Sequence, residues 1–259
     1  MVIMHIIRSF FIAIANYSAI PVPQFEWREE DMRYTLCFFP VVGIVIGVLE
    51  WLWFRLCMAE EIGVLARTLI GVALPLLITG GFHVDGYMDT MDALSSHRSP
   101  EEKRRILKDS HIGAFAVIRL IFYYLLYAAA FSEIQTGRQM MVVCIGFVLT
   151  RTLSGLAAMH FPLAGGKGTM AGMADASAKR VSTIILFAEM ALCILAMVII
   201  DPLPGAAAAV CAEGMLIRYF FMSRKDFGGV SGDLAGYFVT AAELAVALAV
   251  VIMRILFRL

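Results

Sequence analysis

The hydrophobic positions of this chain gather into long runs separated by short polar stretches. Seven runs are long enough to cross a bilayer as helices, since about 20 apolar residues span its hydrocarbon core. They lie at about 34–57, 62–82, 112–135, 139–160, 181–200, 204–222 and 234–257. We therefore expect an all-α, polytopic membrane bundle of roughly seven spans, with residues 1–259 forming a single transmembrane domain.

A further apolar segment precedes these runs at 1–20, with Arg8 inside it, and ends before Pro21-Val22-Pro23. No convincing small-residue cleavage signal follows it, so we do not interpret it as a removed signal peptide. Its length fits either a first span or an amphipathic helix in the membrane interface. The expected fold is therefore the seven spans plus this N-terminal apolar helix.

Composition agrees with a bilayer environment. The chain is 61% hydrophobic with a mean hydropathy of +0.83, whereas a soluble domain is closer to half apolar. A net charge of zero gives no reason to expect a nucleic-acid partner. The five cysteines lie in or at the ends of apolar runs without metal-type spacing, so we expect packing residues, not disulfides or zinc ligands.

Basic residues concentrate in the polar loops 83–111, 161–180 and 223–233, which lie on one side if the spans alternate. Cytoplasmic loops of membrane proteins carry an excess of Lys and Arg, so this side is predicted to face the cytoplasm. Arg254 and Arg258 at the C-terminus would lie on the opposite side of the membrane, which is against this rule. The same three loops carry the candidate chemistry, so we expect them to be cytoplasmic catalytic loops.

The first candidate site is acidic and directly follows an apolar run. Asp85, Asp89 and Asp92 stand at positions i, i+4 and i+7, which share one helical face within roughly 60°. Carboxylates side by side repel one another and are costly near lipid. A hard cation such as Mg²⁺ prefers oxygen ligands and keeps room for substrate phosphates. We therefore predict a metal–diphosphate site at the membrane surface; a solvated acidic face is the alternative.

A basic segment follows the aspartates. Ser99 and Glu102 have the spacing of a helix-capping box, with Pro100 in the first turn. Arg104 and Arg105 are interpreted as a solvated basic face. Lys108 and His111 stand at the edge of the next span, where a lysine can neutralise phosphate as a point charge.

Two glycine-rich loops are further candidates. The loop at 164–169 contains Lys167 but lacks the full phosphate-loop spacing, so flexibility is an equal explanation. In the loop at 227–236, Gly228 and Gly229 permit close backbone approach to a ligand. Asp233 in that loop fits either a helix cap or a further metal ligand.

Several ionisable residues fall inside the spans, where they are functional candidates by default, although structural pairing explains some of them. Arg151 is the strongest, because it stands among Thr150, Thr152 and Ser154 and arginine binds phosphate bidentately. The others are Glu50, Arg119, Glu189, Glu213, Arg218 and Glu243.

Taken together, these motifs resemble the cobalamin synthase family of adenosylcobinamide-GDP ribazoletransferases. The resemblance rests on Gly-Phe-His-Val-Asp-Gly at 81–86 with Asp89 and Asp92, on Lys-Asp-Ser-His-Ile-Gly-Ala-Phe at 108–115, and on Gly-Gly-Val-Ser-Gly-Asp at 228–233. It covers essentially the whole chain. Departures from the family pattern are Ser18-Ala19, where a Thr-Arg pair is frequent, and His111, where arginine is common.

The resemblance implies a Mg²⁺-dependent enzyme of the cell (inner) membrane that acts late in nucleotide-loop assembly of coenzyme B12 (vitamin B12). A ribose hydroxyl of α-ribazole, or of its 5′-phosphate, attacks adenosylcobinamide-GDP; GMP leaves and adenosylcobalamin or its 5′-phosphate forms. Asp85, Asp89 and Asp92 are expected to hold Mg²⁺. Lys108 and Arg151 are expected to bind non-bridging oxygens, and His83 or a carboxylate such as Asp85 to accept the hydroxyl proton. The expected substrate contacts are Lys108, Asp109, His111, Lys167, Gly228, Gly229 and Asp233.

Two other functions remain as alternatives. Membrane phosphotransferases of the CDP-alcohol type also place aspartates at helical spacing, but their Ala-Arg pair after the first Asp-Gly is absent beyond Asp85-Gly86. An ion-coupled transporter would use acids such as Glu189 and Glu243, but it does not explain charged motifs on one side. The sequence leaves open the preferred acceptor and whether the chain forms a homo-oligomer.

Overall fold

The computed structural model describes residues 2–164 and 169–258. Within these ranges the regular elements are helical, with one short 3-10 turn, η1. The elements are α1 Val2–Tyr17, η1 Glu29–Met32, α2 Thr35–Ala59, α3 Val64–Thr79, α4 Phe82–Ser95, α5 Pro100–Ile106, α6 Ala114–Ser132, α7 Gly137–His160, α8 Thr169–Ala176, α9 Lys179–Ile200, α10 Pro202–Phe227 and α11 Gly232–Phe257. The predicted all-α class is confirmed.

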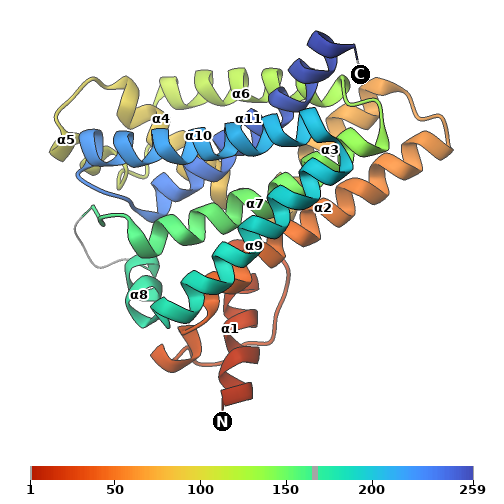
Figure 1. Cartoon of the computed structure of the whole chain (residues 1–259). Helices are drawn as coiled ribbons and strands as arrows, with labels where there is room; N and C mark the ends of the chain where they lie inside the picture. The colour runs from red at the N-terminus through yellow and green to blue at the C-terminus, as the bar shows by residue number, and fades with distance from the viewer. Residues whose placement is uncertain (1, 165–168, 259) are drawn as a thin grey trace.

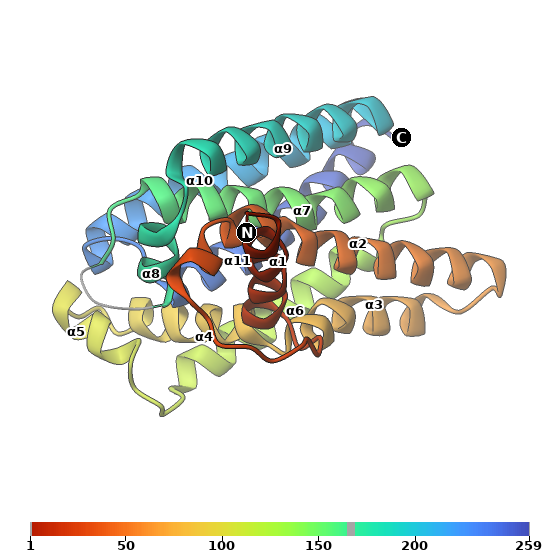
Figure 2. The same ribbon diagram turned by 90° about the horizontal axis from the view of Figure 1, so that it is seen from below.

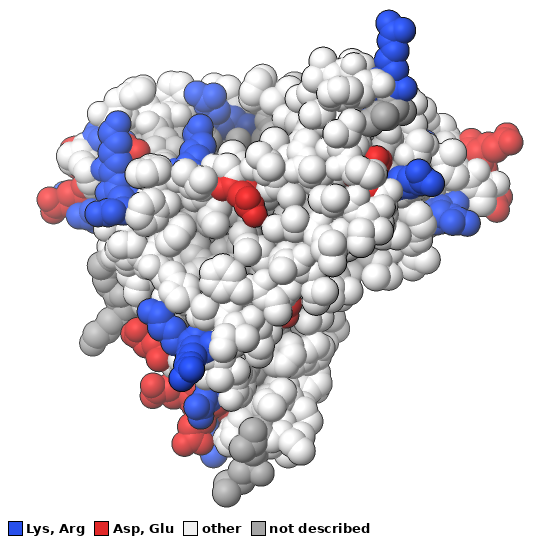
Figure 3. Space-filling view, in the orientation of Figure 1, with Lys and Arg blue, Asp and Glu red and all other residues white. Residues whose placement is uncertain are grey.

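Each predicted span contains a helix in the structure. In the described part of the chain, α2, α6, α7, α9, α10 and α11 are each long and apolar enough to cross a membrane, and α3 with α4 makes a seventh if this bent pair is counted as one span. In Figure 3, charged side chains gather at the left and right ends and along the lower left of the visible face, and the surface between these groups is mostly uncharged, with isolated acidic side chains. This is the charge distribution of a polytopic membrane protein.

The run predicted as one span at 62–82 is broken. Helix α3 ends at Gly80, and Gly80 and Gly81 both have left-handed backbone conformations, with φ of 62° and 83°. Only glycine adopts this geometry without steric cost, so the pair ends α3 and starts α4 at an angle of 95°. The aspartate segment, expected within a polar loop, is therefore a 14-residue helix set across the end of α3.

Helix α7 forms the centre of the bundle. Of the 18 most apolar consecutive residues of α7, 83% are buried inside the protein. The corresponding share for α9 is 17%, so α9 faces outward. It contacts α2, α9, α10 and α11. Small residues permit this packing: a Cβ on Gly47 of α2 would lie 2.8 Å from the Cys144 carbonyl oxygen of α7. The bulky apolar side chains on the outer helices remain exposed, which fits contact with lipid.

Helix α1 lies crosswise to the long helices; it is upright in Figure 1 and seen end-on in Figure 2. Its 16 residues make it short for a span. It is held by the buried carboxylate of Asp31, which accepts hydrogen bonds from His5 at 2.7 Å and Arg8 at 3.1 Å. The hydroxyl of Ser9 also donates to the Asp31 carbonyl at 2.6 Å. This placement favours the interfacial alternative for the N-terminal segment.

The polar connections divide between the two ends of the bundle. Helices α5 and α8 and the α10–α11 connection lie at the left end of Figure 1, and the α2–α3, α6–α7 and α9–α10 connections lie at the other. The described parts of the loops at 83–111, 161–180 and 223–233 thus share one end, as strict alternation of the spans requires. The five cysteines are free, and four of them are buried.

Candidate functional site at one end of the bundle

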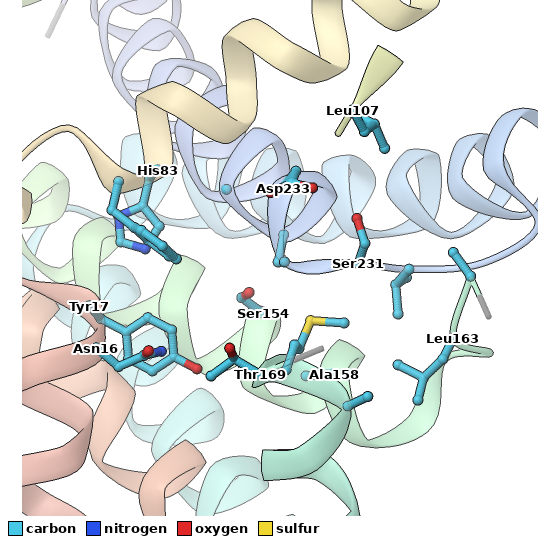
Figure 4. Close-up of a pocket in the computed structure, with 18 of the residues that line it drawn as sticks. Asn16, Tyr17, His83, Leu107, Ser154, Ala158, Leu163, Thr169, Ser231 and Asp233 are labelled. Carbon is cyan, nitrogen blue, oxygen red and sulfur yellow. The ribbon is translucent and has the colours of Figure 1, made fainter. Parts of the chain in front are cut away.

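A cavity of about 660 Å³ opens at the end where these three loops meet. Its wall draws on α1, α2, α4, α5, α7 and α11 and on the segments around α8 (Figure 4). Its volume is in the range of small-molecule sites. The polar side chains in its wall include Asn16, Tyr17, His83, Arg104, Arg105, Lys108, Ser154, Thr169, Ser231 and Asp233.

Backbone contacts join two of the loops into one wall. The Val230 N–H donates to the Pro162 carbonyl at 2.8 Å, and the Ala164 N–H donates to the Val230 carbonyl at 2.9 Å. Gly229 has φ of 152°, and a Cβ there would lie 2.5 Å from the Pro162 oxygen. The close approach expected of this glycine is therefore made to the neighbouring loop. Gly228, with φ of 79°, ends α10 beside the Arg104 guanidinium.

The rim of the cavity is basic. Arg104, Arg105 and Lys108 line it from α5 and the turn after it. Lys103 anchors this helix to α10 through a 2.6 Å ion pair with Asp226, and Arg104 donates to the Phe227 carbonyl at 2.9 Å. Lys108 lines this rim, and its expected contact with phosphate stays a prediction. Arg104 is more than a solvated basic residue, because its guanidinium is held at the Phe227 carbonyl. Arg105 is exposed and pairs with Glu101 at 3.7 Å, as a solvated face predicts.

The other predicted contacts near α5 lie apart from the cavity. Asp109 and His111 are exposed, do not line it, and bond to each other: the imidazole Nδ1 lies 2.7 Å from Oδ1 of Asp109. The bonds from the His111 imidazole and backbone N–H lower the pKa of Asp109. Their predicted substrate contacts are untested. Lys167, also predicted as a contact, lies outside the described residues.

The acidic residues of α4 lie beside the cavity instead of in its wall. Asp85 is exposed and lines a neighbouring groove between α1, α3 and α4, and Asp89 and Asp92 are partly buried. Asp89 is within electrostatic range of Asp85, Asp233 and Asp92. Asp233 lines the main cavity, so it connects the two features.

Close helix packing brings Asp233 to α4. A Cβ on Gly86 would lie 2.5 Å from the Asp233 carbonyl oxygen, and one on Gly236 would lie 2.9 Å from the His83 carbonyl oxygen. The two glycines thus let the backbones of α4 and α11 nearly touch. Ser231 caps α11 by accepting from the Leu234 N–H at 3.4 Å, so the capping role considered for Asp233 belongs to Ser231.

The carboxylates of Asp85, Asp89, Asp92 and Asp233 offer the oxygen donors that a hard cation prefers. They are not close enough together to form a complete metal site by themselves. Across the described residues, no group of three His, Cys, Asp or Glu side chains is close enough to hold a metal ion. Asp92 lies against Gly113 at the start of α6, where a helix N-terminus favours negative charge. No ion pair within the described chain involves Asp85, Asp89, Asp92 or Asp233, so no basic side chain there neutralises them.

His83 faces the inner end of the cavity. Its ring is buried and packs against Phe39, with ring centroids 5.6 Å apart and an interplanar angle of 28°. Neither ring nitrogen has a hydrogen-bond partner among the described residues. Figure 4 shows the imidazole directed toward the same space as Tyr17 and Ser154.

Arg151 lies deeper, one helical turn below Ser154. Its guanidinium is buried, donates to the Phe147 carbonyl at 2.9 Å and forms a 2.7 Å ion pair with Glu243. It is not part of the cavity wall. This placement differs from the phosphate-binding role expected from sequence, and it favours structural pairing, because the guanidinium already has a charged partner.

Sequence reasoning missed several wall residues. Asn16, Tyr17 and Ser154 reach the cavity from α1 and α7, which are distant in sequence from the charged motifs. The one local signal for a missed residue is the i, i+4 spacing of Arg104 and Lys108, which places both on one face of a helix.

The fold and the site together define a multi-pass membrane protein with a basic-rimmed, aromatic-floored cavity at one end of a helical bundle. A sequence model of the family described as Cobalamin-5-phosphate synthase matches residues 9–251. The chain belongs to this family.

Named relatives agree with this assignment. An adenosylcobinamide-GDP ribazoletransferase from Lachnoclostridium phytofermentans is 41% identical over 246 residues, which cover 95% of this chain and 94% of that protein. Proteins of the same name from Listeria monocytogenes and Desulfitobacterium hafniense are 32% and 30% identical, over 88% and 92% of this chain and 91% and 94% of their own lengths. No solved structure matches the chain.

Proposed function

We propose that this chain transfers α-ribazole, or its 5′-phosphate, onto adenosylcobinamide-GDP, with release of GMP, in the late nucleotide-loop assembly of coenzyme B12. The observation that carries the proposal is the family match over residues 9–251, together with relatives named for this reaction. The cavity supports it, because basic, acidic and aromatic groups from distant segments converge there. Family membership also favours this transferase over a CDP-alcohol enzyme or a transporter.

The basic rim is the part of the site best suited to a diphosphate. Attack by a ribose hydroxyl on the cobinamide-side phosphorus forms a new P–O bond, and the bond to the GMP oxygen breaks. Negative charge then builds on the leaving oxygen, so fixed positive charges lower the barrier. We assign this role to Arg104, Arg105 and Lys108, which line the cavity from one segment.

The carboxylates between α4 and α11 would hold the divalent cation. Asp85, Asp89 and Asp233 supply oxygen donors at the edge of the cavity, and Asp92 stands further along α4. Bound Mg²⁺ neutralises diphosphate charge and orients the group for displacement. The hydroxyl proton would pass to the His83 imidazole, or to the Asp233 carboxylate where Asp85 and Asp89 alone hold the cation.

The proposed location is the cell inner membrane with the cavity open to the cytoplasm. Support comes from the basic residues of the loops 83–111, 161–180 and 223–233, which belong on the cytoplasmic side under the positive-inside rule.

The direct test is GMP release by the purified chain in lipid nanodiscs. Adenosylcobinamide-GDP and Mg²⁺ are supplied with α-ribazole, with α-ribazole 5′-phosphate, or with neither. We expect GMP and the corresponding cobalamin product only when an acceptor is present, and the faster of the two reactions identifies the preferred acceptor. If the folded wild-type protein forms neither product, the proposal is refuted.

A further inference from the structure

The inner end of the cavity, defined by Asn16, Tyr17, Phe39, His83 and Ser154, differs from its rim. Three of these residues present rings at small angles to one another. The Tyr17 and Phe39 centroids are 4.0 Å apart at 31°, the Phe39 and His83 centroids 5.6 Å apart at 28°, and the Tyr17 and His83 centroids 6.5 Å apart at 10°. These rings pack on one another and together line the cavity wall, where an aromatic side chain can stack against a planar ligand.

The same end holds polar groups without adequate protein partners. Both nitrogens of the buried His83 ring lack a hydrogen bond within the described chain. Among the described residues, the half-buried Asn16 amide and the buried Tyr17 hydroxyl donate only to the Met173 sulfur, at 4.0 Å and 3.4 Å. Sulfur is a weak acceptor, and a buried polar group without a good hydrogen-bond partner destabilises the protein. These groups point to a ligand that supplies a small number of hydrogen bonds.

The charge of the cavity wall indicates which planar ring, guanine or the base of α-ribazole, fits the inner end. Among the described wall residues the carboxylates are Glu101, on α5, and Asp233, at the start of α11. Figure 4 shows Asp233 apart from Asn16 and Tyr17. Guanine carries adjacent N–H donors that a carboxylate pairs well, whereas the fused benzimidazole ring of α-ribazole is mostly apolar and has one free ring acceptor. The inner end, aromatic and without a described carboxylate, matches the second ring.

We propose that the inner end binds the planar base of the acceptor nucleoside, with the ribose directed toward Ser231 and Asp233 and the diphosphate of the second substrate at the basic rim. This inference rests on the proposed function and adds the location of one substrate. The cavity of about 660 Å³ suits a nucleoside. The much larger corrinoid then lies outside the inner end, beyond the rim.

The test uses thiol protection at Ser154, because cysteine is nearly isosteric with serine and the variant should fold. In Ser154→Cys, a small methanethiosulfonate reagent should modify the new thiol, with wild-type protein giving the background from its five cysteines. We expect α-ribazole to slow modification at least tenfold and GMP or GDP to leave it within twofold. Ser132→Cys, at the opposite end of the bundle, is the control, and its labelling should be insensitive to α-ribazole.

Several results would overturn the inference. Protection of Ser154→Cys by GMP or GDP instead of α-ribazole would place guanine at the inner end. Protection by neither, or a thiol that never reacts, would show that this end does not receive a nucleoside.

A second variant, Ser154→Leu, should raise the KM for α-ribazole at least tenfold and leave the KM for adenosylcobinamide-GDP within threefold. An unchanged KM for α-ribazole in active Ser154→Leu would remove the inference and leave the proposed function intact. Absence of GMP release by the wild-type protein would count against the proposed transferase activity. The protection experiment with α-ribazole would still test whether the inner end binds the base.

Discussion

The guanidinium of Arg151 on α7 and the carboxylate of Glu243 on α11 form a 2.7 Å ion pair that is almost completely buried. Both groups lie within apolar helices, one turn below the cavity wall at Ser154. Removing either partner leaves the other charge uncompensated in a low-dielectric interior, which is costly. The pair therefore links the central helix to the helix that carries Asp233.

Breaking this pair should reduce stability. Glu243→Gln or Arg151→Met is expected to cost about 3–5 kcal/mol, and the double variant Arg151→Met/Glu243→Leu to recover much of that loss. Thermal unfolding in nanodiscs, with turnover per folded molecule, measures both effects. The control Arg105→Met should show the reverse pattern, with normal stability and a raised KM for adenosylcobinamide-GDP. Normal stability in Arg151→Lys combined with a tenfold loss of turnover, about 1.4 kcal/mol, would instead indicate phosphate binding.

The contact between α4 and α11 depends on Gly86. A Cβ there would lie 2.5 Å from the Asp233 carbonyl oxygen, so Gly86→Ala must push the helices apart. We expect a loss of about 1–3 kcal/mol in stability and a marked fall in turnover as Asp233 moves away from α4. Gly214→Ala is the matched control: its Cβ meets open space and should stabilise α10 by up to about 1 kcal/mol. Equal behaviour of the two variants would contradict this account.

The acidic face of α4, formed by Asp85, Asp89 and Asp92, should be essential for turnover. Asp85→Asn and Asp89→Asn keep the shape of the side chain but remove a charged oxygen donor, so turnover should fall by orders of magnitude at saturating Mg²⁺. Asp92→Asn should be milder, because Asp92 lies against the start of α6.

A readout independent of turnover is the thermal stabilisation of the chain by Mg²⁺, which the first two variants should lose. The exposed Asp175→Asn should change neither quantity. Wild-type turnover in both Asp85→Asn and Asp89→Asn would exclude the metal site.

Attachment of α1 should depend on pH. Burial by itself raises the pKa of Asp31, but hydrogen bonds from His5 and Arg8, with their charges, outweigh it and hold the pKa below its ordinary value. A lowered folded-state pKa stabilises the protein above the pKa of an unfolded aspartate, about 3.9. This contribution disappears as the pH falls through the folded-state value.

Asp31→Asn should therefore be less stable at neutral pH, by about 1.5–3 kcal/mol, and lose less stability on acidification than the wild type. Unfolding measured between pH 3 and about 7 checks both expectations. The neighbouring Glu30→Gln, whose carboxylate is exposed and 3.8 Å from His5, should have little effect. A pH profile of Asp31→Asn parallel to the wild type would contradict the proposed role.

The orientation of the bundle can be tested by thiol accessibility. Single cysteines at Ser110, Asp175 and Lys225, exposed on the three basic loops, should react with an impermeant reagent only from the cytoplasm. Cysteines at Glu60 and Arg138, at the other end, should react only from outside. Outside labelling of any one of the first three would mean that the loops do not form one cytoplasmic site.

Local pattern determined the helices of this protein. Six of the seven apolar runs match a long helix within about five residues, because a helix in lipid must satisfy its own backbone and present apolar side chains. The run at 62–82 instead ends as α3 before a sharp bend into α4. The helical face shared by Asp85, Asp89 and Asp92 also followed from spacing alone. The capping box of Ser99 and Glu102 is present as expected, since it is a contact between residues three apart.

Only the tertiary structure decided which distant residues meet. The charge of Arg151 was evident from sequence, but its partner Glu243 is 92 residues away, and a single sequence carries no signal for that pairing. The glycines of the last loop were expected to approach a ligand, yet Gly229 approaches Pro162. The aromatic inner end of the cavity likewise exists only because α1 crosses beside α2 and α4. Burial and pairing of this kind depend on packing between helices, which periodicity along one helix does not encode.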